Sequence, residues 1–102
     1  MIIVTGGVRA RAETVDEVLG LCLEHVERSR REPGCLHHSV HRDVEDPFRA
    51  VFLEHWVDRA ALAAHFSVPA SLEFVTAVSA LAAEPPVLDV YEAERIDIAE
   101  LR

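Results

Sequence analysis

The chain has 102 residues, enough for one small domain with a modest core, and we treat residues 1–102 as that single domain. Its formal net charge is −8 and its basic residues cluster only at Arg28, Arg30 and Arg31, so we expect no nucleic-acid partner. Apolar runs are a handful of residues long and the N-terminus lacks the order of a signal peptide, which predicts no membrane association and a cytoplasmic protein.

The first predicted strand covers residues 2–10, which are rich in β-branched side chains. Gly6-Gly7 within it suggests a bulge or a close approach of another backbone. Thr14 is expected to cap the next helix, with Glu17 completing a capping box. The helix itself is predicted from one apolar stripe at helical spacing, made of Val15, Val18, Leu19, Cys22, Leu23 and Val26.

Two strands follow, once Pro33-Gly34 has ended the helix. Residues 35–43 and 49–57 are predicted to pair as an antiparallel hairpin, because an Asp-Pro turn lies between them. Side chains alternate between faces along a strand, so both faces of the second strand are largely apolar. One face carries Val51, Leu53 and Val57, and the other carries Phe52 and Trp56.

Two helices and a strand are predicted for the last third of the chain. Asp58 caps a helix that runs through Phe66, Pro69 begins a second helix, and residues 87–96 have the composition of a final strand. This order predicts a ferredoxin-like α+β fold, βαββαβ, whose four-stranded antiparallel sheet carries its helices on one face. Because the other face is apolar too, we expect a second copy of the chain to cover it.

Four short segments, residues 32–36, 42–47, 52–56 and 60–66, resemble those of antibiotic biosynthesis monooxygenase domains in order and spacing. The resemblance covers nearly the whole chain. It implies a homodimer in which two sheets pack face to face as a dimeric α+β barrel. It also implies a monooxygenase that oxidises an aromatic phenol or quinol with molecular oxygen and needs no flavin, metal or nicotinamide, so no cofactor is expected.

The hairpin brings a histidine beside Glu54. If paired residue numbers sum to 92, His38 lies opposite Glu54 and His37 opposite His55, whereas a sum of 91 pairs His37 with Glu54. An imidazole beside a carboxylate can act as a base or as a hydrogen-bond donor to a phenol. A structural cross-strand pair is the alternative interpretation, and it is the commoner arrangement.

His65, near the end of its helix, is a third candidate catalytic residue, although it could equally pack and bond a carbonyl group. We therefore take His38, Glu54 and His65 as the catalytic candidates. Aromatic residues are candidates for a flat wall against a ring substrate, although core packing explains most such residues. They are Trp56, Phe66, Phe74 and Tyr91.

A metal site is disfavoured by the sequence. His37 and His41 share a strand face, but about 13 Å separates their Cα atoms at the usual rise of a strand. A two-histidine site from His37 and His55 stays open as an alternative. Heme degraders of this fold need an Asn on the first strand and a His on the later helix, whereas this chain has no Asn and residues 72–83 hold no His.

Two other functions fit the same sequence. One is a non-catalytic dimer that binds a small hydrophobic ligand, since fold does not fix function. The other is an isomerase or decyclase that uses the same barrel without oxygen. Cys22 and Cys35 have no motif spacing, so we expect buried, reduced thiols.

Overall fold

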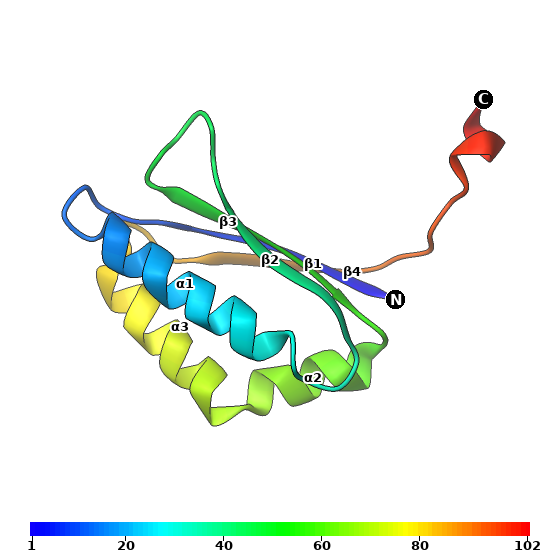
Figure 1. The fold of residues 1–102 in the computed structure, drawn as a ribbon, viewed down its shortest axis with the longest axis horizontal. Helices are drawn as coiled ribbons and strands as arrows, with labels where there is room; N and C mark the ends of the chain where they lie inside the picture. The colour runs from blue at the N-terminus through cyan, green and yellow to red at the C-terminus, as the bar shows by residue number, and fades with distance from the viewer.

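A computed structural model describes residues 1–102 and has the predicted ferredoxin-like α+β fold (Figure 1). Helices α1 and α3 lie side by side on one face of the sheet, with α2 at one end (Figure 1). The elements are β1 (Ile2–Arg9), α1 (Val15–Ser29), β2 (Cys35–Arg42), β3 (Arg49–Trp56), α2 (Arg59–Ser67), α3 (Pro69–Leu81), β4 (Val87–Glu92) and a short 3₁₀ helix (Ile98–Leu101).

The sheet has the strand order β2-β3-β1-β4, and every neighbouring pair is antiparallel. In the hairpin of β2 and β3, His38 lies opposite Glu54 and His37 opposite His55, so the register with a sum of 92 is confirmed. The pairing of β2 with β3 shifts register once, between Cys35 and His37 at the start of β2. This register decides which histidine of β2 faces the helices.

The glycine pair in β1 marks a close approach and not a bulge. Pairing of β1 with β3 runs without a shift from Ile2 opposite Trp56 to Arg9 opposite Arg49. A Cβ on Gly6 would lie 3.0 Å from the carbonyl oxygen of Val87 in β4. Gly6 therefore lets β4 lie close against β1.

Helix α1 is confirmed, but its predicted capping box is wrong. Thr14 does occupy the N-cap position, yet its side chain caps no N–H group of the helix. Its hydroxyl instead donates to the carbonyl oxygen of Leu81 at 2.8 Å and accepts from the N–H of Arg11. A tertiary bond to the end of α3 has replaced the local one.

The second helical segment begins as predicted. The Asp58 carboxylate accepts from the N–H of Ala61 at 2.9 Å, and Pro69 occupies the first turn of α3. No single helix is long and apolar enough to cross a membrane; α2 and α3 pass that test only when taken together, across a bend of 69°.

The two faces of the sheet differ in cover. Alternate residues of β3 are buried beneath the helices, and these include Phe52, Glu54 and Trp56. On the uncovered face, Val51 and Tyr91 are exposed, and His37 and His41 lie on either side of Ser39. Strand β4 is exposed along its whole length. The apolar character predicted for both faces of β3 is confirmed.

Candidate functional site

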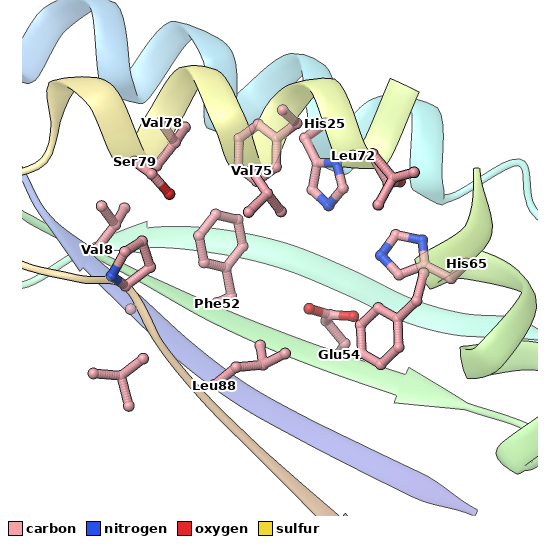
Figure 2. A pocket seen from close by; sticks show the side chains of 16 residues that line it. Val8, His25, Phe52, Glu54, His65, Leu72, Val75, Val78, Ser79 and Leu88 are labelled. Atoms are coloured by element: carbon pink, nitrogen blue, oxygen red, sulfur yellow. The ribbon is translucent and has the colours of Figure 1, made fainter. Parts of the chain in front are cut away.

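A cavity of about 450 Å³ lies between the helices and the sheet (Figure 2). Its walls are mostly apolar, and the polar side chains of Glu54, His25 and His65 gather at one end (Figure 2). A cavity of this size and composition is typical of a site for a small, largely apolar ligand. The lining residues are Gly7, Val8, His25, Phe52, Glu54, His65, Phe66, Ser71, Leu72, Phe74, Val75, Val78, Ser79, Pro86, Val87 and Leu88.

Glu54 is a buried carboxylate held from two sides. The indole N–H of Trp56 donates to its Oε1 at 2.9 Å, and His38 Nε2 lies 3.3 Å from the same oxygen. Burial acts to raise the pKa of Glu54, but the contacts with His38 and Trp56 outweigh it and leave the pKa lowered. The carboxylate is therefore anionic at the polar end of an apolar cavity.

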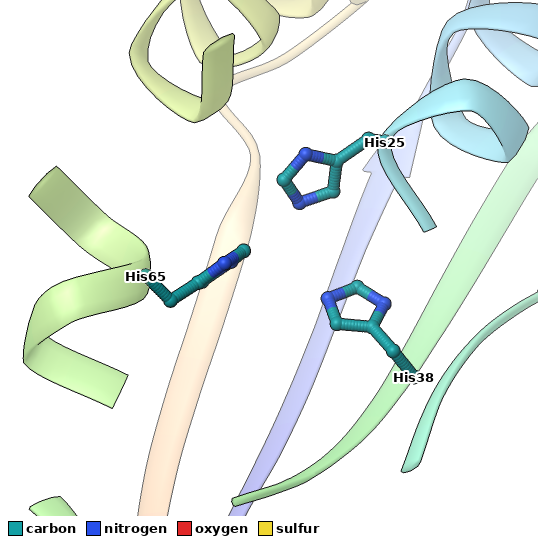
Figure 3. A group of neighbouring side chains, drawn as sticks. All are labelled: His25, His38 and His65. Atoms are coloured by element: carbon teal, nitrogen blue, oxygen red, sulfur yellow. The ribbon is translucent and has the colours of Figure 1, made fainter. Parts of the chain in front are cut away.

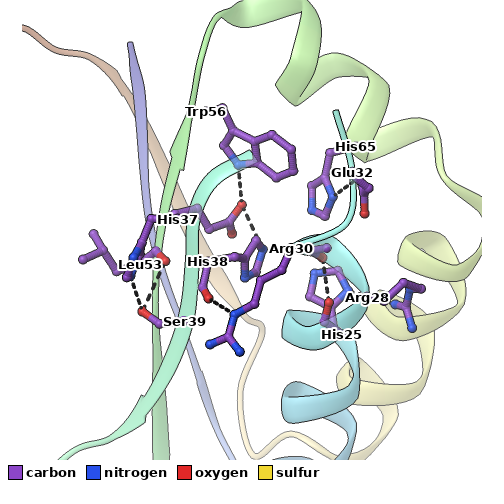
Figure 4. A network of polar contacts seen from close by, with 12 residues as sticks. His25, Arg28, Arg30, Glu32, His37, His38, Ser39, Leu53, Trp56 and His65 are labelled. Carbon is purple, nitrogen blue, oxygen red and sulfur yellow. Dashed lines mark hydrogen bonds and ion pairs between the residues drawn. The ribbon is translucent and has the colours of Figure 1, made fainter. Parts of the chain in front are cut away.

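His65 is oriented by a second carboxylate. Its Nδ1 lies 2.8 Å from Oε1 of Glu32, which follows the end of α1 (Figure 4). A carboxylate accepts only, so Nδ1 carries the hydrogen and Nε2 of neutral His65 keeps its lone pair. The ring also lies 4.7 Å from that of Trp56, between centroids, and points into the cavity (Figure 2). His65 thus offers a proton acceptor to whatever fills the cavity.

His25, on α1, offers the opposite polarity. The Arg28 guanidinium donates to its Nδ1 at 3.0 Å, so the hydrogen of neutral His25 belongs on Nε2. Its ring stacks on Phe74 with centroids 4.0 Å apart and planes within 7°. Burial, and then the charges of His38 and His65, lower the pKa of His25 to about 3. The imidazole is therefore neutral and presents an N–H group.

His38 lies behind the cavity wall and is 1% exposed. Neither of its ring nitrogens has a hydrogen-bond partner, since the contact of Nε2 with Glu54 is not aligned for a bond. Unpaired buried polar atoms are rare and costly. Its ring lies 5.3 Å from that of His25 and 5.7 Å from that of His65, between centroids. The three imidazoles form a cluster drawn from α1, β2 and α2 (Figure 3).

The structure divides the sequence-predicted residues into three groups. Glu54, His65, Phe66 and Phe74 line the cavity. His38 and Trp56 are buried behind it, each in contact with Glu54. Tyr91 does not line it, because its position opposite Ile3 in the register places its side chain on the uncovered face of the sheet.

Two residues of the site, His25 and Glu32, were missed by the sequence interpretation. His25 follows Cys22 by three positions and precedes Ser29 by four, so it continues the buried stripe of α1. That helical spacing was the signal from which a buried His25 could have been predicted. Glu32 meets His65 across 33 residues of sequence, and no local pattern indicates such a contact.

The fold and the cavity together define a class: small ferredoxin-like α+β domains whose helical layer encloses an apolar pocket with an imidazole–carboxylate end. Within that class, residues 1–77 match the family model described as antibiotic biosynthesis monooxygenase, and the chain belongs to this family.

Similar proteins agree with this assignment. A crystal structure of an antibiotic biosynthesis monooxygenase is 33% identical, with a TM-score of 0.86 over 93% of this chain and 100% of that one. A protein from Deinococcus radiodurans, whose description gives the same family name provisionally, is 26% identical with a TM-score of 0.90 over 95% of this chain and 96% of its own. Uncharacterized protein sll1783 of Synechocystis is 34% identical over 89% of this chain, which spans 62% of that relative's length.

Proposed function

We propose that the protein is a monooxygenase that oxidises an aromatic phenol or quinol with molecular oxygen, without flavin, heme or metal as electron carrier. The observation that carries the proposal is the polar end of the cavity, where the proton acceptor of His65 lies near the N–H donor of His25. A phenol oxygen is both a donor and an acceptor, so one hydroxyl group suits both imidazoles.

Binding comes first in the proposed reaction. The aromatic rings of Phe52, Phe66 and Phe74 line the cavity and suit a flat, apolar ring system. The polar end then receives the hydroxyl group, because no other wall of the cavity offers an ionisable side chain. Burial of the substrate also excludes water, which strengthens each charge interaction inside.

Deprotonation follows at His65. Its Nε2 accepts the phenol proton, and the Glu32 carboxylate balances the positive charge of the imidazolium. The N–H of His25 donates to the phenolate oxygen that remains, in the way that a fixed donor stabilises an oxyanion. Neutral His25 suits this role, since its pKa of about 3 keeps it uncharged.

Oxygen chemistry completes the reaction on the substrate itself. The phenolate passes an electron to oxygen, and the two radicals combine at a ring carbon as a peroxide anion. The imidazolium of His65 returns its proton to this anion, and the resulting hydroperoxide loses water. One oxygen atom becomes the new quinone carbonyl and the other leaves as water. The two hydrogens of that water are the hydrogen of the phenol hydroxyl group and the hydrogen of the oxidised ring carbon. The atoms and electrons balance with oxygen as the only oxidant.

The proposed working form is a homodimer that joins the uncovered sheet faces, in the cytoplasm, where Cys22 and Cys35 remain free thiols. Exposed apolar side chains on this face, among them Val51 and Tyr91, support it. Such a contact leaves the cavity, on the helical side, open to substrate.

Oxygen uptake with a panel of anthrones and quinols tests the proposal. We expect one oxygen molecule consumed per quinone formed, at a rate above buffer autoxidation. His65→Ala should lower kcat by about 10²- to 10⁴-fold, the usual contribution of a general base. Glu32→Gln, which changes a positioning residue outside the cavity lining, should lower kcat with little change in KM.

Control variants keep this test specific. Leu23→Ala changes an exposed side chain of α1, outside the cavity lining and away from the uncovered face, and should leave kcat unchanged. If compounds of the panel raise the melting temperature yet none is consumed above autoxidation, the oxygenase proposal fails and the protein is a binding module. Product formed under strict anaerobiosis would instead indicate an isomerase or decyclase.

A further inference from the structure

We propose that the cluster of His25, His38 and His65 binds one divalent transition-metal ion of the zinc class. This goes beyond the proposed function, which needs no ion. The two are linked, however, because the lone pair of His65 cannot hold an ion and accept a substrate proton at once. The form that oxidises a phenol is therefore the ion-free form.

Geometry is the first support. One ring nitrogen from each histidine lies within 4.8 Å of the other two, and no side chain of the cluster is more than 6% exposed. Zinc–nitrogen bonds of about 2.0–2.1 Å place tetrahedral ligands about 3.4 Å apart, so the imidazoles need to close by about 1.4 Å at most. The three rings converge on one point from separate elements, so small side-chain rotations bring them together (Figure 3).

The orientation of His65 is the second support. Metal-bound histidines usually donate their other ring N–H to a carboxylate, a carbonyl group or water. His65 already has this arrangement, since its Nδ1 lies 2.8 Å from Oε1 of Glu32 and its Nε2 is free. His65 is therefore already oriented as a metal ligand.

His38 supplies the third and independent observation. It is 1% exposed, and both ring nitrogens lack a hydrogen-bond partner. A bound ion would satisfy one of them and remove a cost that the ion-free fold bears. Oε1 of Glu54, 3.3 Å from Nε2 of His38, is close enough to become a fourth ligand or to accept from a water on the ion.

Arg28 sets a limit on affinity. Its guanidinium donates to Nδ1 of His25, which leaves the ring hydrogen on Nε2, so neither nitrogen of His25 has a free lone pair while this bond stands. Binding therefore requires Arg28 to release His25, and its second bond, to the carbonyl oxygen of Ala70 at 3.2 Å, can hold it there. Removing this cation should strengthen binding, whereas a merely structural role for Arg28 predicts no gain.

Calorimetric titration of chelator-treated protein with Zn²⁺ is the test. We expect one site per chain, a loss of affinity of at least about tenfold in His25→Phe and His65→Ala, and tighter binding in Arg28→Met. His37→Ala is the matched control, because His37 and His55 form a separate pair on the uncovered face with ring centroids 5.3 Å apart. It should keep the wild-type affinity.

A second measurement avoids variants that fail to fold. Titration of wild-type protein with paramagnetic Co²⁺ should shift the NMR signals of His25, His38 and His65 before those of His37. Shifts confined to the surface histidines, or loss of binding in His37→Ala alone, would overturn the proposal. So would the absence of zinc binding at about 100 μM. Oxygen uptake by the ion-free protein decides the proposed function separately.

Discussion

His25 couples the stability of the protein to pH, because its environment favours the neutral ring. Its pKa is lowered from 6.5 to about 3 in the fold. Between these two pH values, His25 is protonated in the unfolded chain and neutral in the folded chain. Its contribution to the free energy of unfolding is therefore complete above pH 6.5 and is lost as the pH falls.

Substitution of His25 by Phe should remove this pH dependence while keeping the stacking on Phe74. Between about pH 7.5 and 5.5, the free energy of unfolding of the wild type should fall by about 1.4 kcal/mol more than that of His25→Phe. Urea unfolding at both pH values measures the difference. Leu23→Ala, on the exposed side of the same helix, should keep the wild-type slope; equal slopes in wild type and His25→Phe would contradict the argument.

Among single residues, the sequence predicted those whose partners lie on adjacent strands and missed those whose partners lie in other layers. Strand alternation and a short hairpin place either His37 or His38 beside Glu54, and the structure selects His38. The contact of Glu32 with His65 depends on where the end of α1 meets α2, which only tertiary packing decides. Trp56, predicted to contact a substrate, lies outside the cavity lining and donates to Glu54.

At the scale of elements, the turn from α1 into β2 depends on Gly34. Its φ of +81° lies in the left-handed region, and a Cβ there would lie 2.6 Å from Cβ of Ala61 and 2.8 Å from Cγ1 of Val57. Both strain and overlap therefore exclude a side chain. The turn places β2, and with it His38, against the helices.

Gly34→Ala and Gly20→Ala form a matched pair that tests this interpretation. Gly34→Ala should lower the free energy of unfolding by about 1–3 kcal/mol through strain and overlap. A methyl group added at Gly20, inside α1, would have no neighbour within 4 Å, so this replacement should raise stability by about 0.5–1 kcal/mol. Denaturant unfolding at neutral pH measures both. Similar effects of the two changes would show that Gly34 has no special role.

Element positions were predictable because hydrophobic periodicity and proline or glycine breaks act locally. The two predicted helix caps differ for the same reason. Asp58 accepts from a residue three positions away, as predicted, whereas Thr14 bonds to Leu81 across 67 residues. The final strand was predicted to residue 96 but ends at Glu92, where pairing with β1 stops at Ile2. Composition cannot reveal where a partner strand begins.

At the scale of the whole molecule, the uncovered sheet face is the surface on which the proposed homodimer depends. Leu53→Arg would place two charges in an isologous contact, because a two-fold axis repeats each substitution. We expect the wild type to sediment as a dimer at micromolar concentration and the variant as a monomer of 11.3 kDa. Leu23→Arg, on the exposed side of α1, is the control and should remain dimeric. A monomeric wild type would refute the interface.

The cavity draws its walls from β1, α1, β3, α2, α3 and β4, so its completeness requires nearly the whole chain. A fragment that ended at residue 77 would keep every histidine and still lose five residues of the wall: Val78, Ser79, Pro86, Val87 and Leu88. Occupancy by a fluorescent apolar dye should consequently return only in the last phase of refolding, after the helical signal. The pocket would serve as a built-in reporter of native topology.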